Sequence, residues 1–262
     1  MASPEHSDAL FGSRVQDCFG RSACSYEQGA QLQAAIAARL GRHCRRLAAQ
    51  IPAGPRADLG AGSGLLGRAV EANLNGPPLL RVDQCSALLA QEPGSAAGQR
   101  PPQLAWDLNA GLPPALGGAA LLASSFALQW LEHPEQQLAA WCQQLAPGGW
   151  LVLAVPTAGS FGVWRAAAAA AAVPYSGLPL PPAAPLEAIA QAQLQLQRLQ
   201  RLRFNRPNRG ARDLLNQIKS IGAQASRQRR LSTGELRRLI DHWPGPDHAV
   251  NWEVLLLLGQ KR

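Results

Sequence analysis

A run of glycines beside a carboxylate is the first feature of this sequence that could do chemistry. The segment Asp58-Leu-Gly-Ala-Gly-Ser-Gly64 follows an apolar stretch at 56–59 and precedes a helical pattern at 65–73. Glycines at alternate positions let the backbone turn sharply and approach a ligand where a Cβ would collide. A helix that begins behind such a loop offers unpaired backbone N–H groups. The segment therefore predicts a loop that binds a nucleotide-like ligand.

Two further acidic residues stand where the next predicted strands end. Asp83 comes 19 residues after Gly64, and a carboxylate at that distance can accept both hydroxyls of an adenosine ribose. Asp107 follows the third predicted strand and is placed to reach the adenine amino group in the same crevice. Together with the glycine loop, these carboxylates predict an adenosine site.

Two adenosine cofactors compete for this site. The spacing Gly62-x-Gly64-x-x-Gly67 satisfies the fingerprint of dinucleotide-binding loops. An S-adenosylmethionine site instead has an acidic residue two positions before the first glycine, near the methionine amino group, and Asp58 stands there. A pyrophosphate has no need of a carboxylate at that position. The residues favour S-adenosylmethionine and leave a nicotinamide dinucleotide as the alternative.

The elements that must position these residues alternate between short apolar strands and helices. We expect strands at 56–59, 79–82, 103–106, 120–124 and 150–155, with helices at 15–50, 65–73, 86–91 and 135–145. Later patterns predict helices at 159–172, 207–221 and 232–242, a loop at 174–185, and strands at 193–204 and 250–258. Such alternation indicates an α/β fold, with a parallel sheet and helices on both of its faces.

Composition excludes several classes of protein. The chain has 262 residues, of which 47% are hydrophobic and 16% are charged, so it can bury a full core and is not a disordered chain. Its five cysteines are scattered without a Cys-x-x-Cys spacing, and we expect reduced thiols and no metal site. The N-terminal stretch lacks an apolar signal region, and no apolar run is long enough to span a bilayer. We expect a cytoplasmic protein that does not enter a membrane.

Positive charge is concentrated in one region. Residues 191–240 hold twelve Lys or Arg and two acidic residues, whereas the rest of the chain holds thirteen and fifteen, so the formal net charge of +8 is regional. A cluster without acidic residues contains Arg198, Arg201, Arg203, Arg206, Arg209 and Arg212. Such a cluster suits an acidic partner, a nucleic acid or plain solvation. Phe204 is the one aromatic residue among these arginines, which weakens a surface for stacking bases, and we expect no nucleic acid.

Several motifs resemble known families. The Asp58–Gly64 loop, the strand-end Asp83 and the segment Leu145-Ala-Pro-Gly-Gly149 resemble class I S-adenosylmethionine-dependent methyltransferases. Four further segments resemble the malonyl-acyl-carrier-protein O-methyltransferases of biotin synthesis; they run 19–28, 127–130, 157–160 and 218–223. The resemblance covers about 15–260, and 173–203 matches poorly.

This resemblance implies a fold and a set of site residues. The fold would be a doubly wound, mostly parallel seven-stranded sheet with an antiparallel C-terminal hairpin. The chain would form one domain, and the protein would be a monomer. Its parts would be an N-terminal helical cap (1–50), a cofactor-binding core (51–157), a cap insertion (158–204) and the C-terminal part of the core (205–262). The cofactor-binding residues would be Tyr26, Asp58, Gly60, Gly62, Gly64, Asp83, Gln84, Asp107, Leu108, Ser124 and Ser125. We expect Trp130 to pack in the core and His133 to be solvated.

The resemblance also implies a reaction, methyl transfer from S-adenosylmethionine to the free carboxylate of malonyl-acyl-carrier protein or malonyl-coenzyme A. That carboxylate is ionised near neutral pH, so no general base is required and none is assigned. Attack on a sulfonium cancels opposite charges, so a dry pocket with a weakly held carboxylate near Ser125 is expected. Arg198, Arg201, Arg203, Arg206 and Arg209 would receive the acidic carrier. The alternatives are a methyltransferase for RNA or a small molecule, and a nicotinamide-dependent oxidoreductase.

Overall fold

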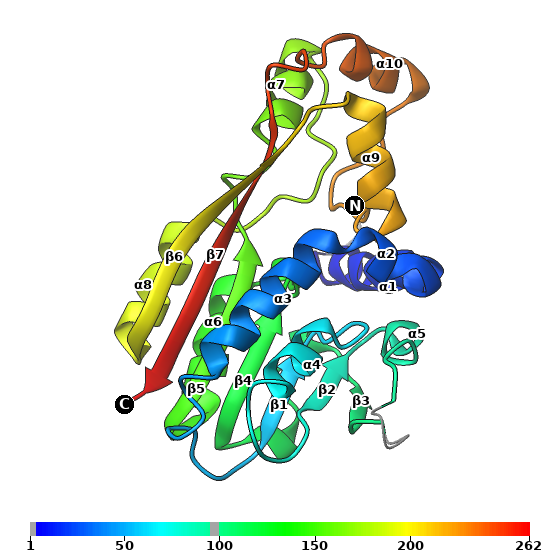
Figure 1. The fold of residues 1–262 in the computed structure, drawn as a ribbon. Coiled ribbons are helices and arrows are strands. Elements are labelled where there is room, and N and C mark those ends of the chain that lie inside the picture. Colours follow the sequence, from blue (N-terminus) through cyan, green and yellow to red (C-terminus); the bar gives the residue numbers. More distant parts are fainter. Residues whose placement is uncertain (1–3, 95–99) are drawn as a thin grey trace.

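The computed structural model describes residues 4–94 and 100–262 (Figure 1). The described residues form a seven-stranded sheet with the strand order β3-β2-β1-β4-β5-β7-β6. Its strands are β1 (Arg56–Leu59), β2 (Leu80–Asp83), β3 (Gln103–Ala105), β4 (Ala119–Ser125), β5 (Leu145–Pro156), β6 (Leu194–Arg206) and β7 (Val250–Lys261).

Strand direction confirms the predicted fold class. The pairs β1–β2, β1–β4, β2–β3 and β4–β5 are parallel, whereas β7 is antiparallel to both β5 and β6. The C-terminal strands do not form a tight hairpin, because residues 207–249 connect them. Since β1 lies between β2 and β4, the strand order reverses there, and ligands of open α/β sheets bind at such a point.

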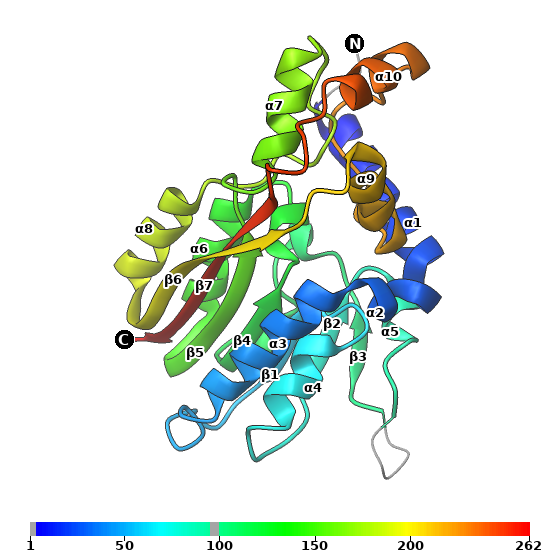
Figure 2. The same cartoon turned by 45° about the horizontal axis from the view of Figure 1, so that its top comes forward.

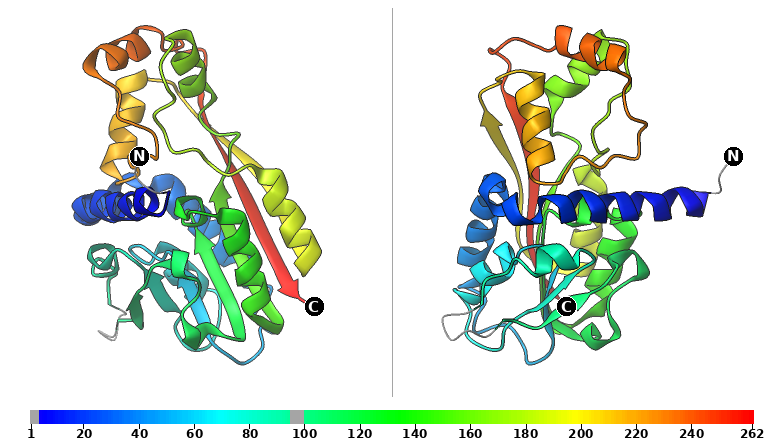
Figure 3. Two further views of the ribbon diagram at one scale, coloured as in Figure 1. Left: turned by 180° about the vertical axis from the view of Figure 1, so that it is seen from behind. Right: turned by 90° about the vertical axis from the view of Figure 1, so that its right-hand side faces the viewer.

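Helices cover both faces of the sheet. α3 (Gln31–Cys44) and α4 (Leu65–Glu71) lie on one face, and α6 (Pro134–Gln144) and α8 (Ala183–Gln193) lie on the other, which Figure 3 shows from behind. Alternate residues of a strand point to opposite faces. Thus Leu256 of β7 packs with the α3 side and Leu257 packs with the α6 and α8 side. Burial on both faces explains the uninterrupted apolar run of this strand.

The remaining helices lie beyond the carboxyl edge of the parallel strands (Figure 2). They are α1 (Pro4–Ser22), α2 (Tyr26–Gly29), α5 (Ser86–Leu89), α7 (Gly162–Ala170), α9 (Ala211–Ser220) and α10 (Thr233–Asp241). α7, α9 and α10 share an apolar cluster that includes Trp164, Leu214 and Leu239. Within the described ranges, no helix has the length and apolarity that a membrane crossing requires.

The division of the C-terminal half differs from the expected one. Residues 194–206 form β6 of the sheet, and α8 packs on the sheet, although both fall in the expected insertion at 158–204. Conversely, α9 and α10 lie outside the sheet with α7, although they fall in the expected core part at 205–262. α8 was not predicted, because prolines precede it and its buried stripe rests on few residues, among them Leu186 and Ala190.

Candidate functional site

A cleft opens at the carboxyl ends of β1, β2 and β4, where the strand order reverses. It has a volume of about 850 Å³ including the part open to solvent. The structure gathers most of the predicted cofactor residues along it: Tyr26, Asp58, Gly60, Gly62, Asp83, Gln84, Asp107, Leu108 and Ser125. Gly64 and Ser124 lie behind the lining. Its size and location suit a nucleotide-sized ligand.

The glycine loop requires glycine for two distinct reasons. Gly60 has a φ of +66°, and a Cβ there would overlap the Cβ of Ala127 in the turn after β4. Gly64 has a φ of +83° and is the N-cap of α4, so its left-handed backbone starts the helix at little steric cost. The loop and the turn after β4 thereby approach more closely than side chains would allow.

Asp83 holds the glycine loop while it faces the cleft. Its Oδ2 accepts a hydrogen bond from the Gly62 N–H and its Oδ1 accepts one from the Cys85 N–H, each at 2.8 Å. Burial raises the pKa of Asp83, and these two N–H donors oppose that rise. Because each carboxylate oxygen can accept a second hydrogen bond, Asp83 keeps capacity for the two hydroxyls of a ribose.

Asp58 is a buried carboxyl with one unused acceptor. It is 1% exposed. Its Oδ2 accepts a hydrogen bond from the Gly67 N–H at 2.8 Å, whereas its Oδ1 has no hydrogen-bond partner among the described residues. Burial raises the pKa of Asp58 to about 7, although the charge of Arg81 and the Gly67 N–H lower it. A cationic ligand group would satisfy the unused oxygen and stabilise its charge.

The charge of the cleft distinguishes between the two cofactors that the sequence left open. Asp58, Asp83 and Asp107 line it, and the described lining contains no Lys, Arg or His. A pyrophosphate would bring negative charge beside these carboxylates, which is unfavourable. A sulfonium and an amino group would bring positive charge instead. The residues present therefore fit S-adenosylmethionine better than a dinucleotide.

The two serines at the end of β4 have different surroundings. The Oγ of Ser124 donates a hydrogen bond to the Leu59 carbonyl at 2.8 Å, and the side chain is fully buried. Ser124 therefore ties β4 to β1. Ser125 lines the cleft, and its Oγ has no hydrogen-bond partner among the described residues. The next residue, Phe126, has a φ of +56°, a strained conformation for a residue other than glycine, and it also lines the cleft.

A larger hollow, which we call the chamber, joins the cleft. Its volume is about 2450 Å³ including open solvent, and it lies beside α1, α9 and the loop after α9. The lining shared by cleft and chamber consists of Phe19, Tyr26, Gln33, Phe126 and Trp130. The Phe19 ring contacts Trp130 edge-on, with centroids 5.3 Å apart. Trp130 is half-buried at this junction, which differs from the core position that the sequence predicted.

Several positively charged residues line the chamber. Its lining includes Arg14, Arg21, Lys219, Arg229 and Arg230 against one acidic residue, Asp17. These positive side chains are exposed, whereas the aromatic residues of the lining are buried or half-buried: Phe126, Phe161, Trp164, Tyr175 and Trp252. The chamber therefore offers an apolar interior and a cationic border.

The arginine cluster that the sequence predicted does not form one patch. Arg198 lies on the α3 side of β6, where burial and, after it, the charges of Arg198 and neighbouring arginines lower the pKa of His43. Arg201 lies on the other side, and its Nη2 contacts the Glu187 Oε2 of α8 at 2.5 Å. An extended strand directs successive side chains to opposite faces, which the spacing of arginines in the sequence does not reveal.

The remaining members of the cluster have other neighbours. Arg203 reaches Glu253 at 3.9 Å, Arg206 binds Asp213 and Gln217 of α9, and Arg209 is exposed in the loop before α9. Among the described residues that line the cleft and the chamber, no member of the predicted cluster occurs. The chamber residues Arg14, Arg21, Arg229 and Arg230 were missed, because nothing near them in the sequence marks a cavity.

No protein-family model matches the chain. The chain is 38% identical over 148 residues to the malonyl-[acyl-carrier protein] O-methyltransferase of Alcanivorax borkumensis, which covers 56% of this chain and 49% of that protein. It is 36% identical over 121 residues to the trans-aconitate 2-methyltransferase of Rhizobium meliloti, covering 44% of each.

One further relative matches nearly the whole chain. The biotin biosynthesis bifunctional protein BioCD of Bordetella avium is 29% identical over 239 residues, covering 90% of this chain and 50% of that protein. The chain spans about half the length of these curated relatives. Among solved structures, the magnesium protoporphyrin IX methyltransferase of Synechocystis with bound SAH has a TM-score of 0.51 at 12% identity, covering 91% of this chain and 85% of that one. The chain thus has a methyltransferase fold, and the resemblance to malonyl-acyl-carrier-protein O-methyltransferases is confirmed.

Proposed function

We propose that this chain methylates the free carboxylate of a malonyl thioester. It has the fold of class I methyltransferases, and its sequence resembles malonyl-acyl-carrier-protein O-methyltransferases. The methyl donor would be S-adenosylmethionine, and the thioester would be carried by acyl-carrier protein or coenzyme A. One observation carries the proposal: a cleft lined by acidic residues opens into an apolar chamber with a cationic border. The names of two relatives, malonyl-[acyl-carrier protein] O-methyltransferase and biotin biosynthesis protein, support it.

The residues of the cleft would hold the cofactor at three points. The unused Oδ1 of Asp58 would accept from the amino group of its methionine part. Asp83 would accept from the ribose hydroxyls, beside Gln84, and Asp107 and Leu108 would face the adenine. Tyr26 would close the cleft from α2. When bound, S-adenosylmethionine supplies a methyl group on a positively charged sulfur.

Methyl transfer to a carboxylate makes few demands on acid–base chemistry. A carboxylate oxygen forms the new bond to the methyl carbon, the carbon–sulfur bond breaks, and its electron pair remains on sulfur. No proton moves, so the reaction requires no general base. The protein would contribute orientation and exclusion of water. Phe19, Phe126 and Trp130 surround the junction where acceptor and donor would meet. The Ser125 hydroxyl would bind the substrate carboxylate more weakly than an arginine would.

The cationic border of the chamber would receive the carrier. Acyl-carrier proteins are acidic around their phosphopantetheine attachment, as the resemblance implies, and Arg14, Arg21 and Arg230 would attract such a surface. The phosphopantetheine arm would then extend through the apolar interior toward Trp130. This docking site replaces the one expected on Arg198 and the other arginines of β6, since they are divided between the two faces of that strand.

The decisive experiment is incubation of the protein with S-adenosylmethionine and malonyl-carrier protein, followed by mass spectrometry. We expect one added methyl group per malonyl group. Acetyl-carrier protein lacks the free carboxylate and should stay unmodified. Methylation of bulk RNA, with no change in the malonyl substrate, would contradict the proposal.

A free polycarboxylate is the second candidate acceptor, because one relative bears the name trans-aconitate 2-methyltransferase. The chamber distinguishes the two candidates, since a small tricarboxylate would fill little of its apolar interior. We expect trans-aconitate to be methylated much more slowly than malonyl-carrier protein at equal concentration. The dinucleotide alternative is tested by calorimetric titration with S-adenosylhomocysteine and with NAD. Tight binding of NAD alone would contradict the proposed cofactor.

A further inference from the structure

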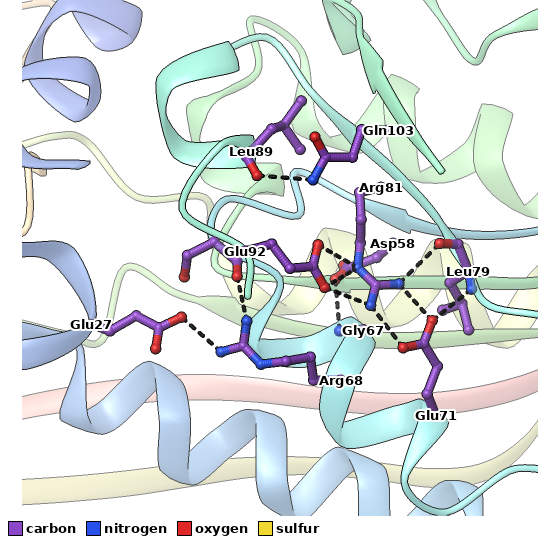
Figure 4. Close-up of polar contacts among 11 residues, drawn as sticks. Glu27, Asp58, Gly67, Arg68, Glu71, Leu79, Arg81, Leu89, Glu92 and Gln103 are labelled. Atoms are coloured by element: carbon purple, nitrogen blue, oxygen red, sulfur yellow. Dashed lines mark hydrogen bonds and ion pairs between the residues drawn. The ribbon is translucent and has the colours of Figure 1, made fainter. Parts of the chain in front are cut away.

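A fully buried arginine lies directly behind the glycine loop. Arg81 of β2 is 0% exposed, and Figure 4 shows its guanidinium between two glutamates. Its Nη1 and Nη2 each donate to Glu71 of α4 at 2.8 Å. Its Nε and Nη2 donate to Glu92, at 2.8–3.0 Å, and Nη1 also donates to the Leu79 carbonyl at 2.9 Å. Every N–H of the guanidinium is therefore used.

This ion-pair network occupies the space behind the loop. A Cβ at Gly67 would overlap the guanidinium of Arg81, and a Cβ at Gly64 would overlap the carboxylate of Glu92. Gly67 also donates its N–H to Asp58. The network is thus in contact with the segment that carries the loop into α4, on the side away from the cleft.

Arg81 is also a neighbour of Asp58 across the sheet. The two residues are register partners in the parallel strands β1 and β2, so their side chains leave the sheet on the same face. The other ionisable groups whose charges act on Asp58 are Glu92 after α5 and Asp83 on β2, and Tyr26 on α2 feels the charge of Asp58 in turn. Arg81 is therefore the one positive group among these neighbours, and Glu71 and Glu92 partly neutralise it.

We propose that Arg81 is a positioning residue for the cofactor: from behind the glycine loop it keeps the Asp58 carboxylate charged and oriented to receive the amino group of the ligand. This inference rests on the proposed function. It assigns a role to the buried arginine of β2, which with two carboxylate partners would otherwise contribute to folding alone.

A pH dependence follows from the position of Arg81. Burial alone would keep Asp58 protonated, and a protonated carboxyl binds an ammonium group poorly. The wild-type protein should lose affinity for S-adenosylhomocysteine as the pH falls below about 7, where Asp58 takes up its proton. Without the positive charge of Arg81, this midpoint should move upward by about one to three pH units.

Calorimetric titration with S-adenosylhomocysteine between pH 5.5 and 8.5 tests the inference. Arg81→Gln should raise the midpoint and weaken binding at pH 7.5 by about threefold for a shift of one pH unit and by about 25-fold for two, because the charged fraction of Asp58 falls accordingly. Arg81→Lys keeps the charge and should restore the wild-type midpoint. Glu92→Gln removes a neighbouring negative charge and should lower the midpoint. Arg56→Gln, which removes an arginine that bonds the Asn75 carbonyl outside the cleft, should leave it unchanged.

A second ligand separates this role from support of the fold. 5′-Methylthioadenosine has the adenosine but lacks the amino group, so its affinity should change less than twofold in Arg81→Gln. Equal losses for both ligands would show that the arginine merely supports the loop. If Arg81→Gln does not fold, the direction of the Glu92→Gln shift decides. An unchanged midpoint in both variants would overturn the inference, whereas wild-type protein that binds no S-adenosylhomocysteine would contradict the proposed function itself.

Discussion

Replacing Asp58 by asparagine should change how the stability of the ligand-free protein depends on pH. Burial raises the pKa of Asp58 from its ordinary value of 3.8 to about 7 in the folded protein. Between these values the folded protein holds a proton that the unfolded chain has released. The free energy of unfolding therefore falls as the pH rises from about 4 to about 7, and the contribution is constant above that range.

The size of the effect follows from the difference in pKa. About three pH units at about 1.36 kcal/mol per unit correspond to about 4 kcal/mol, an order-of-magnitude value. Asparagine has no proton to release, so Asp58→Asn lacks this loss. The variant should gain about 4 kcal/mol relative to wild type between pH 4 and pH 8, whatever its absolute stability.

Urea unfolding, followed by circular dichroism at pH values from 4 to 8, measures this difference. Groups that both proteins share cancel when the two free energies are subtracted. Ser125→Ala is the matched control, because Ser125 lines the same cleft and its removal changes no ionisable group. A difference between Asp58→Asn and wild type that stays within about 1 kcal/mol over this pH range would refute the assignment of a buried, proton-holding Asp58.

Three other substitutions test separate features. Gly60→Ala should abolish S-adenosylhomocysteine binding in calorimetry, because its Cβ would overlap Ala127. Gly118 has a similar φ of +67° but open space around the position of a Cβ. Gly118→Ala should therefore lower the free energy of unfolding in urea by only about 1–2 kcal/mol. Charge reversal of Arg14 and Arg21 should raise the KM for malonyl-carrier protein by about tenfold at low salt, more than that for malonyl-coenzyme A. An equal effect from charge reversal of Arg45 and Arg46, which are exposed just after α3, would contradict a specific border. Ser124→Ala should lower the free energy of unfolding by about 1–3 kcal/mol, with an unchanged dissociation constant for S-adenosylhomocysteine; a loss of binding alone would contradict its structural role.

Much of the cleft could be predicted because its residues belong to neighbouring units of one sheet. Asp58 and Asp83 lie in the last residues of the adjacent parallel strands β1 and β2, and Gly62 follows β1, so spacing along the chain translates directly into proximity. The difference between Ser124 and Ser125 could not be predicted in this way. They are consecutive residues of one strand, and only the fold shows that the first faces the Leu59 carbonyl and the second faces the cleft.

The chamber could not be predicted from the sequence for a related reason. Its lining comes from α1, the turn after β4, the segment after β5, the loop after α9 and β7. Residues so far apart meet only through packing between the sheet and the helices beyond its edge. The motif at 19–28 did contain Phe19 and Tyr26, but a motif does not say which cavity a ring borders.

By itself, the amino-acid sequence determined the α/β fold and the acid-and-glycine pattern of the proposed adenosine site, because both depend on local periodicity and short spacing. Only the tertiary structure decided which charges act together. It divided the arginines of β6 between two faces, brought Arg14 and Arg230 to one chamber, and placed Arg81 beside Asp58 behind the loop. Electrostatic interactions depend on distance and burial in three dimensions, and neither quantity can be read along the chain.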